Sequence, residues 1–170
     1  DNLSNAIFKK LNIKPKKRDL RDWQNLAKII RSVEKPVKIG IVGKYFGAGD
    51  FVLADSYISV IEALKHSIYF FKRLPELHWL DADEFTSSDN LKKLSQYNGI
   101  VIPGGFGSRG VEGKIAAIRC ARERKIPFLG LCYGMQLAIV EFSRAVLGYK
   151  DANTTEVNLE TRHPVIDILP

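Results

Sequence analysis

A single cysteine lies between two glycines in the stretch Gly130-Leu131-Cys132-Tyr133-Gly134-Met135-Gln136. An apolar run at 126–129 precedes it, and a run with helical character follows at 137–146. A strand that turns abruptly into a helix at a cysteine is typical of a nucleophile elbow. The strained backbone of such a turn needs small neighbours, which Gly130 and Gly134 supply. Unpaired N–H groups at a helix N-terminus stabilise a thiolate, so the pattern predicts a reactive sulfur.

Strand-like and helix-like segments alternate on the N-terminal side of this elbow. Strands are expected at 37–42, 77–80, 99–102 and 127–131, and helices at 56–71, near 91–94 and at 111–123. Repeated units of this size predict a three-layer α/β fold, with a mainly parallel sheet and helices on both faces. Sites in such sheets lie at the carboxyl ends of the strands, where the elbow and a glycine-rich loop at 103–107 both fall.

The composition predicts an ordinary globular chain. Its 170 residues are 45% hydrophobic and 26% charged, which allows one domain with a substantial core. No apolar run approaches the ~18 residues of a membrane span and the N-terminus is unlike a signal peptide, so no membrane partner is expected. Two distant cysteines favour a reducing, cytoplasmic location, and no Cys/His spacing resembles a metal site.

The formal net charge is +7. This excess indicates either a surface for anionic partners, nucleotides included, or a solvated basic arm within residues 9–18. Aromatic residues do not interleave with the basic cluster, so no nucleic-acid partner is expected. Residues 1–35 resemble an appendage, with a charged break at 14–18. An amphipathic helix is expected at 19–34, with Asp19 placed to cap it and an apolar stripe that must pack on a partner.

Backbone N–H groups free of bulky side chains are the main feature of the loop Pro103-Gly104-Gly105-Phe106-Gly107-Ser108-Arg109-Gly110. Acyl transfer through a thiol needs donors aimed at the developing oxyanion. One N–H from Gly105 or Phe106, together with that of Tyr133, would form this hole. A tight turn without a ligand, or a phosphate cradle, is the alternative interpretation of the loop on its own.

Several motifs together carry a family resemblance: Pro103–Gly113, Gly130–Ala138, Gly43-Lys44-Tyr45, 55–64, 141–144 and 152–156. They resemble the glutaminase domains of CTP synthases, which are class I glutamine amidotransferases. The resemblance implies a flavodoxin-like fold that is incomplete at its C-terminal end. It also implies that 1–35 is an interdomain linker, and that 36–170 is the N-terminal part of the glutaminase domain.

The resemblance also implies a reaction and its site. Cys132 would attack the side-chain amide of glutamine, form a thioester and release ammonia for the ATP-dependent amination of UTP to CTP. The glutamine-binding residues implied are Gly105, Phe106, Tyr133, Gly134, Met135, Gln136 and Glu156. The Glu156 carboxylate would pair with the substrate ammonium group, because a desolvated ammonium needs an anion beside it.

Partners and cofactors follow from the same resemblance. A synthase domain in the same polypeptide would hold Mg²⁺ and ATP, whereas this domain would hold no cofactor. GTP would act as an effector near Arg109 and Glu112, and the whole enzyme would be a homotetramer.

The general base is the main departure from the family. A thiol hydrolase needs a histidine oriented by a carboxylate, and the family carries it as His-Pro-Glu in a segment expected beyond residue 170. The motif His163-Pro164-Val165 lacks the glutamate, so His163 is interpreted as a strand-edge residue. His66 and His78 are interpreted as packing residues, and Cys120 as a buried structural thiol. This fragment alone is therefore expected to be inactive.

The stretch 46–53 is longer than in the family and is either a lid or a tolerated insertion. Two other functions remain open. One is a different cysteine-elbow hydrolase, such as a peptidase or a deglycase-like protein, although Gln136 and Glu156 suit an amino-acid substrate better. The other is a non-catalytic, nucleotide-binding regulatory module that docks through the helix at 19–34.

Overall fold

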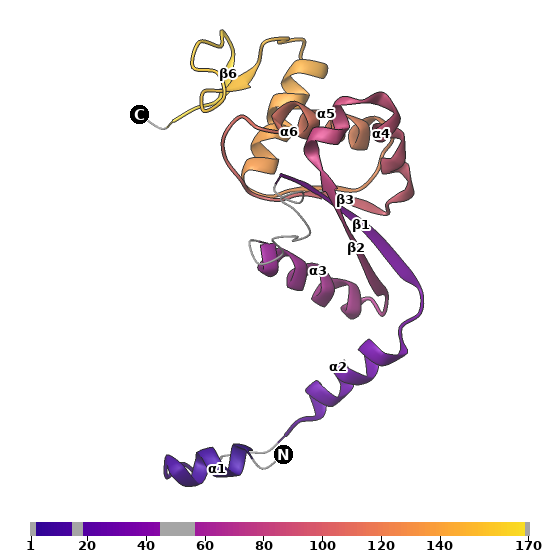
Figure 1. The fold of residues 1–170 in the computed structure, drawn as a ribbon, viewed down its shortest axis with the longest axis vertical. Helices are drawn as coiled ribbons and strands as arrows, with labels where there is room; N and C mark the ends of the chain where they lie inside the picture. The colour runs from indigo at the N-terminus through magenta and orange to yellow at the C-terminus, as the bar shows by residue number, and fades with distance from the viewer. Residues whose placement is uncertain (1–2, 15–18, 45–56, 169–170) are drawn as a thin grey trace.

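The computed structural model describes residues 3–14, 19–44 and 57–168. Four parallel strands form its central sheet in the order β2-β1-β3-β4. In chain order they are β1 (Pro36–Gly43), β2 (Leu74–Asp81), β3 (Gly99–Ile102) and β4 (Phe128–Gly130). Each overlaps a segment expected to be a strand, and the parallel pairing confirms the predicted α/β architecture (Figure 1).

Helices connect these strands. They are α3 (Ile58–Phe70), α4 (Ser88–Lys93), α5 (Val111–Glu123) and α6 (Tyr133–Ala145), with the short 3₁₀ turns η2 (Ala82–Thr86) and η3 (Leu94–Gln96). The crossover from β1 to β2 and that from β3 to β4 run in opposite directions across the sheet. Right-handed crossovers therefore place α3 and α5 on opposite faces, as Figure 1 shows.

The main core lies between the sheet and the pair α5 and α6. Val42, Ile100 and Ile102 join this cluster. Ile41 and Val101 are also buried and point to the other face, because successive side chains of a strand alternate. The carboxyl ends of β3 and β4 thus lie directly beneath α5 and α6, the two helices whose N-termini follow the predicted loops.

Two helices precede the sheet, α1 (Leu3–Lys10) and α2 (Arg21–Ser32). The first was not expected, and the second lies within the predicted helix at 19–34. Asp19 accepts a hydrogen bond from the Arg21 N–H at 3.2 Å, although Leu20 occupies the N-cap position. The apolar stripe of α2 is only partly covered, since Trp23 remains 70% exposed. The proposed domain boundary at 35/36 stays a prediction.

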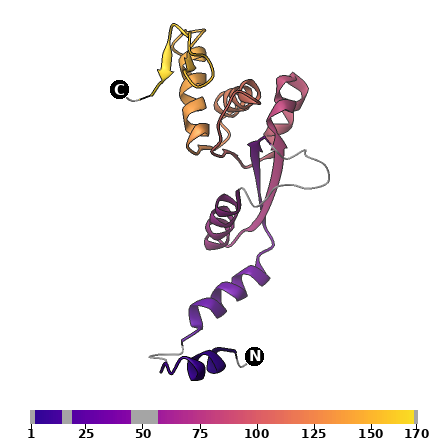
Figure 2. The ribbon, with the colours of Figure 1, turned by 60° about the vertical axis from the view of Figure 1, so that its left-hand side comes forward.

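Beyond α6 the chain forms a second, two-stranded parallel sheet from β5 (Asn153–Thr154) and β6 (Pro164–Ile166). Figure 2 shows this pair beside the C-terminal half of α6. The predicted insertion at 46–53 lies outside the described residues. In the part of the chain that the structure describes, no helix is long and apolar enough to cross a bilayer.

Candidate active site

Cys132 occupies a strained turn between β4 and α6. Its φ of +50° and ψ of −107° lie in a region that residues other than glycine rarely adopt. The turn is closed by a hydrogen bond from the Gly134 N–H to the Leu131 carbonyl at 2.9 Å, and the Gln136 N–H donates to the Cys132 carbonyl at 3.1 Å at the start of α6. The side chain is exposed, so the thiol stands at the start of a helix and is open to solvent. This is the geometry expected of a nucleophile elbow.

The glycines on either side of the cysteine allow α6 to approach the sheet closely. A Cβ at Gly134 would lie 2.1 Å from the Ile102 carbonyl oxygen, and one at Gly130 would lie 2.7 Å from the Gly134 backbone. The sequence predicted small residues here because of strain in the turn. The structure shows that packing requires them, because the first turn of α6 rests against the end of β3.

The glycine-rich loop after β3 lies next to the elbow. A Cβ at Gly104 would lie 3.6 Å from the Cys132 Cβ, an ordinary van der Waals contact. The N–H groups of Gly105 and Phe106 therefore follow directly on a residue that lies against Cys132. The Phe106 side chain is 70% exposed, so it leaves the loop open toward solvent.

Hydrogen bonds from several elements hold this loop in place, and two of them converge on Gly107. The Gly107 N–H donates to Glu156 Oε1 at 2.6 Å, and the Tyr133 hydroxyl donates to the Gly107 carbonyl at 2.8 Å. The Lys44 ammonium donates to the Phe106 carbonyl. The φ of Gly107 is +77°, a conformation that glycine adopts without strain. The loop is thus tied to the first residue of α6 and to the segment after β5.

Lys114 lies behind the loop and was not predicted from the sequence. It is only 1% exposed, and its Nζ lies 5.4 Å from the centre of the Tyr133 ring. Burial and the nearby charge of Lys44 lower the Lys114 pKa to about 8. Burial also raises the pKa of Tyr133 to about 12, with a further contribution from Glu156, so the hydroxyl that supports the loop stays protonated at neutral pH.

A cavity of about 450 Å³ opens beside the elbow, and its lining comes from α6 and the second sheet. The lining residues are Gln136, Thr154, Thr155, Glu156, Leu159, Ile166, Asp167 and Ile168. The structure therefore brings Gln136 and Glu156 to one cavity, which Cys132 does not line, and Gln136 lies one helical turn after Cys132. Met135 is half exposed on α6 and does not line it.

Asp167 is a lining carboxylate that sequence reasoning missed. It accepts a hydrogen bond from the Thr155 hydroxyl at 2.8 Å. The parallel pairing of β5 with β6 brings Asp167 to the cavity, and strands this short leave no periodic pattern in the sequence.

The two candidate effector residues already have partners. Arg109 Nε lies 3.3 Å from Asp83 Oδ2, and both side chains are largely exposed. Glu112 receives hydrogen bonds from Arg144 Nη1 at 2.9 and 3.0 Å. Arg109 and Glu112 flank the N-terminus of α5, next to the loop, so they lie close to the site without lining the cavity.

The histidines pair with carboxylates or face a distant cavity. His163 Nδ1 lies 2.6 Å from Asp151 Oδ1 just before β6, and His78 lies 3.0 Å from Glu76. His66 lines a cavity between α2 and α3. Cys120 is buried, which raises its thiol pKa. Within the described residues, no group of three or more His, Cys, Asp or Glu side chains is arranged to hold a metal ion.

Comparisons with known proteins agree with this arrangement. A family profile described as "Glutamine amidotransferase class-I" matches residues 52–168. The chain is 45% identical over 169 residues to a CTP synthase of Halalkalibacterium halodurans, and 47% identical over 169 residues to one of Sulfolobus acidocaldarius. Each match covers 99% of this chain but 31% of the relative, so the chain spans about a third of their length.

A solved structure shares the fold as well. It is the glutaminase domain of a Trypanosoma brucei CTPS with bound acivicin, with a TM-score of 0.70 and 38% sequence identity. The match covers 78% of this chain and 50% of that one. From the parallel sheet, the cysteine elbow and these matches we conclude that the chain belongs to the class I glutamine amidotransferase family.

Proposed function

We propose that this chain is the glutaminase part of a CTP synthase and that Cys132 is its nucleophile. The observation that carries the proposal is the exposed, strained Cys132 lying against Gly104 of the glycine-rich loop. A peptidase with the same elbow is less well supported, because the cavity that Gln136 lines carries two carboxylates, Glu156 and Asp167, which suit a substrate with a free ammonium group.

The chemistry begins with the thiolate. Cys132 Sγ attacks the amide carbon of the glutamine side chain, and the carbonyl oxygen becomes an oxyanion. The N–H groups of Tyr133 and of Gly105 or Phe106 stabilise that charge. The amide nitrogen takes a proton from the protonated general base and leaves as ammonia, which gives a γ-glutamyl thioester. Water, deprotonated by the same base, then cleaves the thioester to glutamate and restores the thiolate.

The cavity residues select the amino acid. Glu156 uses one oxygen to hold the Gly107 N–H, and its second oxygen is the acceptor for the substrate ammonium. Gln136 lines the same cavity and supplies an uncharged donor and acceptor. A peptide-bonded glutamine would lack the free ammonium that this carboxylate recognises, so free glutamine is the substrate that fits best.

The remaining parts of the reaction belong to the larger protein. By likeness to the family, the histidine base and its carboxylate come from outside these residues, and a synthase domain holds Mg²⁺ and ATP and aminates UTP with the ammonia. GTP acts as an effector near Arg109 and Glu112, and the assembly is a homotetramer.

Covalent labelling tests the proposal. We expect acivicin, the compound bound in the trypanosomal structure, to modify the Cys132 peptide of the whole gene product and not the Cys120 peptide, as read by mass spectrometry. A Cys132→Ala variant should lose glutamine hydrolysis, whereas a Cys120→Ser variant should keep it. Label on Cys120, or hydrolysis that survives Cys132→Ala, would refute the assignment.

A further inference from the structure

Arg144 connects three elements on the side of the molecule away from the cysteine. It lies in the last turn of α6, and its side chain is 20% exposed. Its Nη1 donates to both carboxylate oxygens of Glu112 on α5, at 2.9 and 3.0 Å. Its Nε donates to the Ala152 carbonyl at 2.6 Å. One guanidinium therefore joins α5, α6 and the residue just before β5.

Each of these elements carries one part of the candidate site. The cysteine elbow begins α6, the glycine-rich loop leads into α5, and Glu156 follows β5. The hydrogen bond from Gly107 to Glu156 connects the loop to the β5 segment on the site side. Arg144 connects the same two segments on the far side, so the contacts form a closed ring through α5, α6 and β5.

The bond to Ala152 is hard to replace. Ala152 is completely buried, and among the described residues Arg144 is the one recorded donor to its carbonyl. Loss of that donor would leave a buried carbonyl without a partner, which favours a shift of the segment that leads to Glu156. The cysteine elbow would keep its position on the sheet, because the packing of Gly134 on β3 holds it there.

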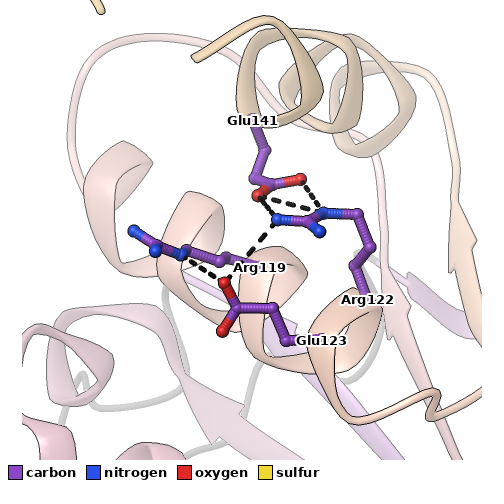
Figure 3. Close-up of polar contacts among 4 residues, drawn as sticks. All are labelled: Arg119, Arg122, Glu123 and Glu141. Atoms are coloured by element: carbon purple, nitrogen blue, oxygen red, sulfur yellow. Dashed lines mark hydrogen bonds and ion pairs between the residues drawn. The ribbon is translucent and has the colours of Figure 1, made fainter. Parts of the chain in front are cut away.

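A second ion pair between the same two helices offers a comparison with Arg144. Arg122 on α5 makes a bidentate contact with Glu141 on α6, at 2.9 and 2.8 Å, as Figure 3 shows. This pair also holds α5 against α6, yet among the described residues neither side chain makes a hydrogen bond or ion pair to the β5 segment. Of the two ion pairs that join α5 to α6 in the described residues, the one made by Arg144 also reaches Ala152, the residue just before β5.

We propose that Arg144 is a positioning residue that holds the Glu156 segment in register with the cysteine elbow. This inference rests on the proposed glutaminase function. Arg144 touches neither the nucleophile nor the cavity, so it acts through Ala152 and Glu112. Its loss should weaken glutamine binding more than it slows the chemical step at Cys132.

Kinetics of the whole gene product test this role. We expect Arg144→Met, which has no donor, to raise the KM for glutamine about five- to tenfold, the effect of losing one hydrogen bond at a buried partner, with a smaller change in kcat. Amide hydrogen exchange should accelerate at 152–158 and stay unchanged at 133–140. Arg144→Lys keeps the charge and a donor group and should recover part of the KM, which also covers the case in which Arg144→Met folds poorly.

Arg119→Met is the matched control, since it removes an exposed arginine on α5 whose ion pair, within the described residues, stays in its own helix. An unchanged KM and unchanged exchange in both Arg144 variants would overturn the positioning role. A fall in kcat equal to the rise in KM, with faster exchange across all of α6, would also overturn it in favour of general destabilisation. Failure of the glutaminase function itself would show separately, as an unmodified gene product that does not hydrolyse glutamine.

Discussion

Glu156 accepts a hydrogen bond from the Gly107 N–H at 2.6 Å, which joins the segment after β5 to the loop after β3. The two residues are 49 positions apart, and each borders a different part of the site. The carboxylate therefore both holds the loop and faces the cavity. Its position links the proposed oxyanion donors to the proposed recognition of the substrate ammonium.

Glu156→Gln should raise the KM for glutamine at least tenfold, because an amide does not neutralise the substrate ammonium as a carboxylate does. Steady-state glutamine hydrolysis by the whole gene product measures it. Glu160→Gln is the control, since Glu160 is exposed on the same segment and should leave the KM unchanged. Equal KM values for the two variants would exclude Glu156 from substrate binding.

Gly134→Ala should destabilise the protein by about 1–3 kcal/mol or more, because the added Cβ would overlap the Ile102 carbonyl and push α6 away from β3. Gly104→Ala makes an informative comparison, since its Cβ would meet Cys132 at 3.6 Å, an ordinary contact. Urea denaturation of both variants measures the difference. Similar unfolding free energies would show that α6 does not pack on the sheet as described.

Lys114 should make stability depend on pH in the alkaline range. Its folded pKa of about 8 lies below the ordinary value of 10.5, so the unfolded chain binds more protons between these two pH values. The free energy of unfolding should therefore gain a rising contribution from pH 8 to 10.5. Urea denaturation at several pH values should show that Lys114→Met removes this rise and that Lys28→Met, at an exposed site on α2, does not.

Arg122→Met should destabilise the protein by about 2–3 kcal/mol, because it leaves the Glu141 carboxylate buried without a partner. The cost falls below that of a fully buried pair, since Arg122 is 35% exposed. The neighbouring Arg119→Met removes an exposed pair within α5 (Figure 3) and should have no measurable effect. Thermal unfolding compares them, and equal melting temperatures would contradict the role given to Glu141.

The strands and the elbow could be predicted because their signals are local. Apolar runs of four to eight residues between helical patterns indicate a parallel sheet, and a cysteine between Gly130 and Gly134 indicates a sharp turn. The proximity of the loop to Cys132 followed from topology, because both lie at the carboxyl ends of neighbouring strands. The strands β5 and β6 were missed, since two or three residues carry no periodicity.

The sequence by itself determined the βα order, the place of the cysteine at a helix N-terminus and the glycine positions, because each depends on neighbours within a few residues. Only the tertiary structure decided that Glu156 meets Gly107, that Lys114 lies buried behind the loop and that Arg144 reaches Ala152. These contacts join segments distant along the chain, and their formation depends on how α5, α6 and the second sheet pack together. Hydrophobic periodicity sets which face of an element is buried, but it does not set which charged side chains meet across the buried surfaces.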